Sequence, residues 1–93
     1  MAEIKHGHNK FYVGDSEENP DAEMTYVPTG KDKIIIDYTG VGESLRGQGI
    51  AKQLVEAGVN YARENDIKIL ATCPFAKQVL EETPEYHDVL LKG

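Results

Sequence analysis

The stretch Val41-Gly42-Glu43-Ser44-Leu45-Arg46-Gly47-Gln48-Gly49-Ile50-Ala51 decides how this chain folds, together with the run from Lys52 to Glu64 that follows it. At a helical step of about 100° per residue, the apolar and polar side chains of residues 50–64 separate onto opposite sides. The apolar side holds Ile50, Ala51, Leu54, Val55, Ala57, Gly58, Val59, Tyr61 and Ala62, and the polar side Lys52, Gln53, Glu56, Asn60, Arg63 and Glu64. The pattern predicts a half-buried helix with a glycine-rich entrance.

This entrance suits an anion. Gly47 and Gly49 let the backbone approach a ligand or adopt dihedrals that a side chain disfavours. The first turn of a helix offers free N–H groups and partial positive charge, and Arg46 and Lys52 add cations that an anion would stabilise there. The alternative is a tight strand-to-helix turn with solvated cations. The loop lacks the Gly-Lys-Ser/Thr ending of a Walker motif and the third glycine of a dinucleotide fold.

Length and composition indicate one domain over residues 1–93. A net charge of −6 argues against nucleic acid or an anionic membrane as partner; it suits an amine-bearing partner, and it also serves solubility. No apolar run has membrane-spanning length and the N-terminus lacks a signal-peptide pattern, so we expect a cytoplasmic protein. One cysteine excludes an intrachain disulfide, and we expect no metal site. The sequence leaves the oligomeric state open, a monomer included.

Alternation before the glycine-rich loop predicts strands over residues 9–14, 22–27 and 33–39, the first two forming a hairpin and the second ending at Pro28. Ile34, Ile36 and Tyr38 are expected on one face of the third strand. Three consecutive isoleucines predict that the other face is covered too, at least at Ile35. The segment around His6 and His8 reads as a polar lead-in, and a metal there has no third ligand nearby.

Beyond the helix, residues 67–72 read as a mostly buried strand. A strand, a helix and a strand with short links form a right-handed parallel crossover, which places Val41 and Cys73 at the same edge of the sheet. Pro74 is suited to begin a second, shorter helix that ends before Pro84, and residues 84–91 add a last turn. The predicted class is α+β or α/β: antiparallel N-terminal strands, a β-α-β unit and a short C-terminal helix.

With these elements in place, Arg46-Gly47-Gln48-Gly49-Ile50-Ala51 fits the Arg/Gln-x-x-Gly-x-Gly/Ala signature of the GNAT acetyltransferase superfamily. The chain resembles a short, minimal-core GNAT subfamily from about Ile34 to Leu90, through Thr39-Gly40-Val41, Cys73-Pro74-Phe75 and Pro84-Glu85-Tyr86. In this family the signature holds the pyrophosphate of acetyl-coenzyme A. The strand before it carries a bulge that aims backbone groups at the pantetheine arm. Gly40 and Gly42 either permit such a bulge or simply end the strand.

The resemblance implies that acetyl-coenzyme A is the cofactor and that a backbone N–H near Val41 stabilises the developing oxyanion. The residues expected to hold the cofactor are Val41, Arg46, Gly47, Gln48, Gly49, Ile50, Ala51, Lys52, Cys73, Pro74, Phe75 and Lys77. For Lys77, one turn into the second helix, the alternative is a solvated side chain.

Two residues are candidates for the chemistry. Cys73 stands beside a helix start, which lowers the pKa of a thiol and favours the thiolate. It would accept the acetyl group and pass it on to the amine. The alternatives are that Cys73 lines the cofactor channel or is a small buried residue. Tyr86 would protonate the departing thiolate, its alternative being a packed side chain, and His87 reads as a surface histidine. Tyr38 and Gly40 depart from the short subfamily, whose members commonly place a histidine and an acidic residue there.

The function expected from this resemblance is an acetyl-coenzyme A-dependent N-acetyltransferase with an unidentified amine acceptor. The departures at Tyr38 and Gly40 favour an alternative, a non-catalytic module that binds acyl-coenzyme A or carries the acyl group. A domain without any ligand would leave the glycine-rich loop and its two cations unexplained.

Overall fold

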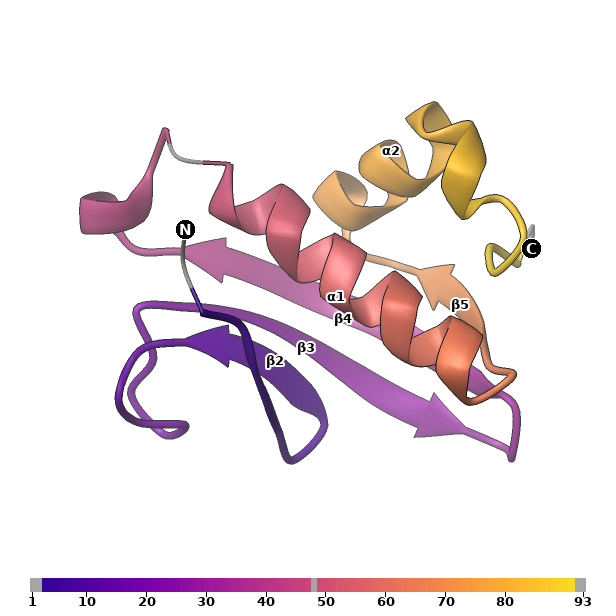
Figure 1. Ribbon diagram of the computed structural model, residues 1–93, viewed down its shortest axis with the longest axis horizontal. Coiled ribbons are helices and arrows are strands. Elements are labelled where there is room, and N and C mark those ends of the chain that lie inside the picture. The colour runs from indigo at the N-terminus through magenta and orange to yellow at the C-terminus, as the bar shows by residue number, and fades with distance from the viewer. Residues whose placement is uncertain (1–2, 48, 92–93) are drawn as a thin grey trace.

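The computed structural model describes residues 3–47 and 49–91 as a five-stranded sheet with two helices (Figure 1). The elements are β1 (Lys5–Gly7), β2 (Lys10–Val13), β3 (Ala22–Thr29), β4 (Lys33–Val41), the 3₁₀ turn η1 (Glu43–Leu45), α1 (Ile50–Glu64), β5 (Lys68–Ala71), α2 (Pro74–Glu82) and the 3₁₀ turn η2 (Pro84–Tyr86). The strands lie side by side in chain order. β1 to β4 are antiparallel neighbours, whereas β5 is parallel to β4.

The sequence-based expectation of the fold is confirmed in its main parts. α1 spans the residues that the helical pattern selected, and Pro74 is the first residue of α2, where its missing N–H leaves no bond unmade. β4, α1 and β5 form the parallel crossover. α2 ends at Glu82 and η2 adds the turn after Pro84.

Both helices pack on one face of the sheet. α1 lies over β2 to β5, and α2 lies beside α1 over β4 and β5 (Figure 1). Side chains of the sheet face toward α1 and of both helices form one core: Phe11, Val13, Ala22, Met24, Tyr26, Ile34, Ile36, Ile50, Leu54, Val55, Val59, Ala62, Ile69, Ala76, Val79 and Leu80. None of the described elements covers the opposite face, where Val27 is 48% exposed and Ile35 half-buried. The expectation that the face of Ile35 is covered is therefore wrong.

The N-terminal segment and Pro28 also differ from expectation. Residues around His6 form β1, paired with β2, and the His6 ring stacks on Phe11 with centroids 4.3 Å apart. Its Nε2 lies 2.6 Å from the Tyr26 hydroxyl, while the side chain as a whole is exposed to solvent, as expected. β3 continues past Pro28 to Thr29, because β2 pairs with β3 only as far as Thr25 and the missing proline N–H costs no bond to β2.

A bulge in β4 decides which side chains face the helices. Thr25 pairs with Tyr38 while Tyr26 pairs with Ile36, so Asp37 is an extra residue on β4, and its Oδ1 accepts a 2.6 Å hydrogen bond from the Thr25 hydroxyl. Tyr38 therefore lies on the uncovered face, 54% exposed, and does not share a face with Ile36 as expected. The strand does not bulge at Gly40, and it ends at Val41, directly before Gly42.

Candidate functional site

Pairing between β4 and β5 ends at Ile36, and β4 continues beyond the end of β5 (Figure 1). Ile36 pairs with Ala71 at the end of β5, and its carbonyl accepts hydrogen bonds from the backbone N–H groups of Thr72 (2.9 Å) and Cys73 (3.2 Å). β4 then continues to Val41 with β3 on one side and no pairing to β5 on the other. No strand within the described residues pairs with the backbone groups along this edge.

The loop after β4 approaches α1 through two glycines in left-handed conformations. Gly47 has φ 84° and Gly49 φ 73°, and a Cβ on either would meet no atom within 4 Å. Glycine is therefore suited here by backbone geometry rather than by lack of space. Gly49 caps α1 but has no side chain to bond the first amides, and the first turn holds no acidic residue. Gln48, expected in this site, lies outside the described residues.

A cleft of about 300 Å³ lies where this loop, the end of β4 and the start of α2 meet. Its lining residues are Val41, Leu45, Arg46, Gly47, Gly49, Ile50, Ala51, Lys52 and Phe75. The apolar side chains form one part of the wall, and two exposed cations stand at the helix start. Leu45 was missed by sequence reasoning, although a lone apolar residue within a polar loop was a usable signal.

The remaining residues expected to hold the cofactor lie elsewhere. Cys73 is the N-cap of α2 and only 8% exposed, next to the cleft through Phe75 but not part of its lining. Pro74 is exposed and also outside the lining. Lys77 lies along a different hollow, with Leu70, Thr72, Glu81 and Leu91 among its other walls. The structure does not bring Lys77 to the cleft.

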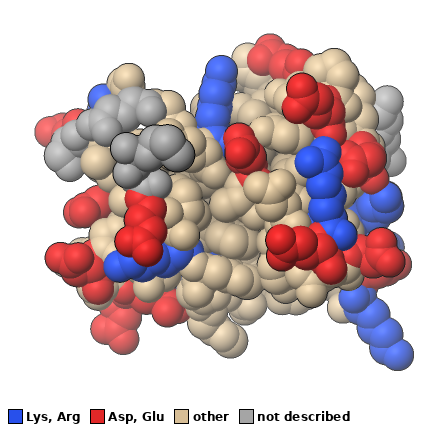
Figure 2. All heavy atoms as spheres, viewed as in Figure 1, with Lys and Arg blue, Asp and Glu red and all other residues tan. Residues whose placement is uncertain are grey.

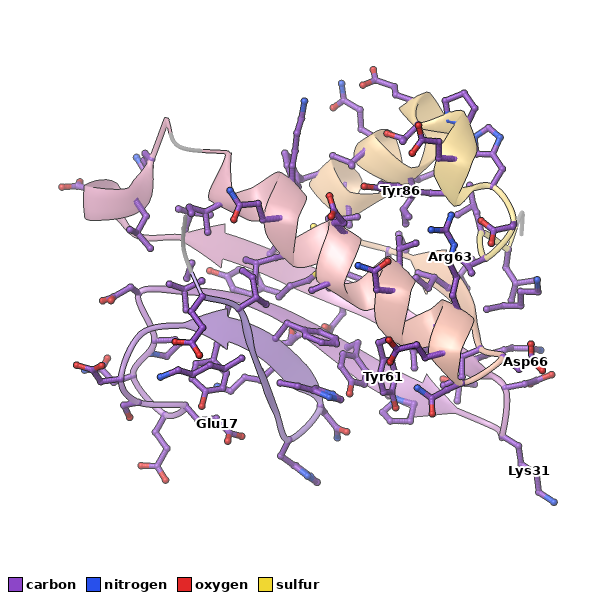
Figure 3. The ribbon with its side chains drawn as sticks, viewed as in Figure 1. Glu17, Lys31, Tyr61, Arg63, Asp66 and Tyr86 are labelled. Carbon is purple, nitrogen blue, oxygen red and sulfur yellow. The ribbon has the colours of Figure 1, made fainter. Side chains whose placement is uncertain are left out.

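Tyr86 lies over the middle of α1, beside Arg63, rather than at the glycine-rich loop (Figure 3). Burial raises the pKa of its hydroxyl above 10.0, and the negative charges of Glu56 and Glu85 raise it further. Arg63 bonds both carboxylate oxygens of Asp88, at 3.0 and 2.9 Å, which ties the C-terminal segment to α1. Tyr86 and Cys73 are thus not assembled around the cleft.

A second hollow, of about 210 Å³, is walled in part by the last residues of β4 and was not anticipated. Its lining is Pro20, Asp21, Ala22, Glu23, Tyr38, Gly40, Val41 and Gly42. Tyr38 folds over Gly40, so that its hydroxyl occupies the place where a Cβ on residue 40 would stand. A side chain at residue 40 would therefore require the Tyr38 ring to move.

Acidic side chains are spread over both flanks of the molecule (Figure 2), in keeping with the net charge of −6. Among the described residues, no group of three or more His, Cys, Asp or Glu side chains is placed to hold a metal ion. The helices within residues 3–47 and 49–91 are too short or too polar to span a membrane.

Comparisons with known proteins agree on one family. A family model described as GCN5-related N-acetyl-transferase matches residues 10–89. Protein NATD1 of Xenopus tropicalis and that of Homo sapiens are each 33% identical to the chain over 63 residues, 68% of this chain. The match spans only 58% and 56% of those relatives' own lengths.

Two solved structures resemble the fold. A GCN5-like protein from Staphylococcus aureus is 51% identical with a TM-score of 0.82, covering 99% of this chain and 90% of that one. A ribosomal-protein-alanine N-acetyltransferase from Brucella melitensis is 21% identical with a TM-score of 0.55, over 80% of this chain and 62% of that one. The second likeness concerns the fold alone.

Proposed function

Because this chain belongs to the GCN5-related N-acetyltransferase family, we propose that it binds acetyl-coenzyme A in the cleft at the start of α1 and transfers the acetyl group to an amine. The observation that carries the proposal is the convergence of three features on one cleft. These are the left-handed glycines before α1, the free amides of its first turn, and the unpaired edge of β4.

The residues present fit such a ligand. A diphosphate suits the N–H groups of Ile50, Ala51 and Lys52, with positive charge from Arg46 and Lys52. The free β4 edge offers backbone donors and acceptors to the amide groups of a pantetheine arm, and Phe75 offers an apolar wall. Lys77 is not part of this proposal, because it lies along another hollow.

When bound, acetyl-coenzyme A supplies an activated acetyl thioester. A backbone N–H on the free edge of β4, in the stretch that follows Ile36 and ends at Val41, would stabilise negative charge on the thioester oxygen. In a two-step route the Cys73 thiol, at the separation of β4 and β5, would take the acetyl group while its proton leaves with coenzyme A as the free thiol, and an amine would then displace the Cys73 sulfur. In a direct route Cys73 would line the channel. Tyr86 is less well supported as proton donor, since its hydroxyl faces Glu56 rather than the cleft.

A second candidate is a module that binds or carries an acyl group without turnover. The observation that favours it is Tyr38 folded over Gly40, which fills the place where the family resemblance puts an acidic residue. A panel of amines separates the two candidates: release of free coenzyme thiol that depends on an amine indicates an enzyme. Intact mass of the wild type and of Cys73→Ala after incubation with acetyl-coenzyme A then shows whether Cys73 carries the acyl group.

Binding itself is tested by calorimetric titration with coenzyme A. We expect Arg46→Ala with Lys52→Ala to weaken binding roughly tenfold, because two charges near the diphosphate are lost. Lys31→Ala is the matched control: Lys31 projects from the far turn between β3 and β4 (Figure 3), and its loss should leave the affinity unchanged. Equal affinities of all three proteins, or no binding by the wild type at millimolar ligand, would reject the proposed cleft.

A further inference from the structure

Thr39 carries an unexplained buried hydroxyl. Within residues 3–47 and 49–91, its Oγ1 is the one buried side-chain oxygen or nitrogen without a hydrogen-bond partner. Leaving such a group unpaired is unfavourable, because it loses its bonds to water and gains none in return. A valine side chain has nearly the same shape as threonine and carries no hydroxyl, so it would fill this position without leaving a polar group unpaired.

Thr39 is not among the residues that line the cleft, but it lies two residues before one of them on β4. The bulge at Asp37 turns Thr39 to the helix-covered face, opposite Met24, and Val41 follows two residues later on that face. Val41 lines the cleft. In the other direction along β4 lies Ile36, whose carbonyl holds the backbone N–H of Cys73. Thr39 thus lies on the part of β4 that pairs with β3 but not with β5. It stands between Val41 at the cleft and Ile36, which binds the backbone of Cys73.

We propose that the Thr39 hydroxyl donates a hydrogen bond to the carbonyl oxygen of the bound acyl group, an inference that rests on the proposed binding of acetyl-coenzyme A. A group seated at the helix start and extending along β4 passes Val41 first and reaches Thr39 about 7 Å further on. The hydroxyl keeps its proton, so no bond to Thr39 forms or breaks. The hydroxyl is unsatisfied in the free protein and satisfied by the acyl ligand, so Thr39 distinguishes acetyl-coenzyme A from coenzyme A.

The test compares Thr39→Val, which keeps the shape and removes the hydroxyl, with Thr39→Ser, which keeps the hydroxyl. We expect Thr39→Val to bind acetyl-coenzyme A roughly three- to tenfold more weakly, the value of one hydrogen bond, and coenzyme A unchanged. Thr39→Ser should bind both ligands within about twofold of the wild type. In urea, free Thr39→Val should unfold at the same or a higher midpoint than the wild type.

The results distinguish a failure of the proposed function from a failure of the Thr39 assignment. Wild-type protein that binds neither ligand defeats the proposed function, and this inference with it. Wild-type protein that binds both, with Thr39→Val unchanged or equally weakened toward both, defeats only the assignment of the hydroxyl to the acyl carbonyl. Thr39→Val that unfolds far more readily shows that the hydroxyl has a partner in the protein, which also overturns the assignment. A measurement on the wild type needs no variant: the Thr39 methyl resonance should move with acetyl-coenzyme A and much less with coenzyme A.

Discussion

At the scale of single residues, Tyr38 and Gly40 show how one side chain determines what its neighbour can be. The Tyr38 hydroxyl fills the position of a Cβ on residue 40, and Tyr38 is exposed enough to move away. Tyr38 and Gly40 both line the hollow beside Asp21 and Glu23, so a displaced Tyr38 ring would change the shape of this hollow. The two positions should therefore be energetically coupled.

We predict that Gly40→Ala lowers the free energy of unfolding in the wild type but not in a Tyr38→Ala background, with a coupling of about 0.5–1 kcal/mol. In the second background the alanine meets no ring, and it restricts the unfolded chain. Urea unfolding of the four proteins of this cycle measures the coupling. Additive effects would show that the Tyr38 ring does not pack over residue 40 in solution.

Tyr26 is the residue whose ionisation should be most visible. Burial, and then the nearby Tyr61, raise the pKa of Tyr26 to about 12, and its hydroxyl contacts His6. In the unfolded chain the pKa is 10.0, so the stability from keeping Tyr26 neutral is complete below pH 10.0 and is lost as the pH rises toward about 12.

The prediction is a fall in the free energy of unfolding across this alkaline range that is smaller in Tyr26→Phe. Phenolate absorbance should show one tyrosine of the wild type titrating near pH 12. Tyr12→Phe, which removes a tyrosine hydroxyl from the uncovered face, serves as the control for the loss of a hydroxyl away from the core. Parallel alkaline curves for the wild type and Tyr26→Phe would contradict the assignment.

At the scale of elements, the start of α1 depends on backbone conformation more than on side chains. Gly49 has φ 73° and Gly30, in the turn between β3 and β4, has φ 70°, and a Cβ on either meets no atom within 4 Å. The two glycines therefore carry the same backbone requirement, one beside the cleft and one far from it.

We predict that Gly49→Ala and Gly30→Ala each destabilise the fold by about 1–2 kcal/mol, the cost of a left-handed alanine. Only Gly49→Ala should weaken binding of coenzyme A, because it shifts the amides at the start of α1. Thermal unfolding and calorimetric titration of the pair measure both effects. A similar loss of affinity in Gly30→Ala would mean that lower stability alone reduces binding.

At the scale of the whole molecule, the two layers give the sheet one buried and one open face. Ile36 faces the helices and is fully buried, whereas its neighbour Ile35 points to the uncovered face and is half-buried. Substitutions at these two adjacent isoleucines therefore measure the packing of the two sheet faces separately.

We predict that Ile36→Val costs about 0.5–1.5 kcal/mol of unfolding free energy, as for a methylene removed from a packed core. Ile35→Val should cost less than about 0.5 kcal/mol, because part of its surface is already in solvent. Urea unfolding of both variants measures the difference. Equal losses would indicate that a second layer covers Ile35 in solution.

We also propose that the single core makes the chain one domain.

The sequence by itself determined the features that depend on local periodicity and local dihedral preference. The 3.6-residue pattern of residues 50–64 placed α1, Pro74 placed the start of α2, and the short links implied the parallel crossover. The glycines before α1 lie at a cleft that is lined by eight of the twelve residues expected to hold the cofactor: Val41, Arg46, Gly47, Gly49, Ile50, Ala51, Lys52 and Phe75. Their role in binding stays a prediction.

Only the tertiary structure decided the features that depend on pairing between distant segments. The bulge at Asp37 arises from the register of β4 against β3, and it moved Tyr38 to the open face and Thr39 to the covered one. The contact of His6 with Tyr26, the placement of both helices on one face and the position of Tyr86 away from the cleft likewise depend on residues far apart in the chain. Because a shift of one residue in strand pairing reverses which side chains face the core, no local pattern contains this information.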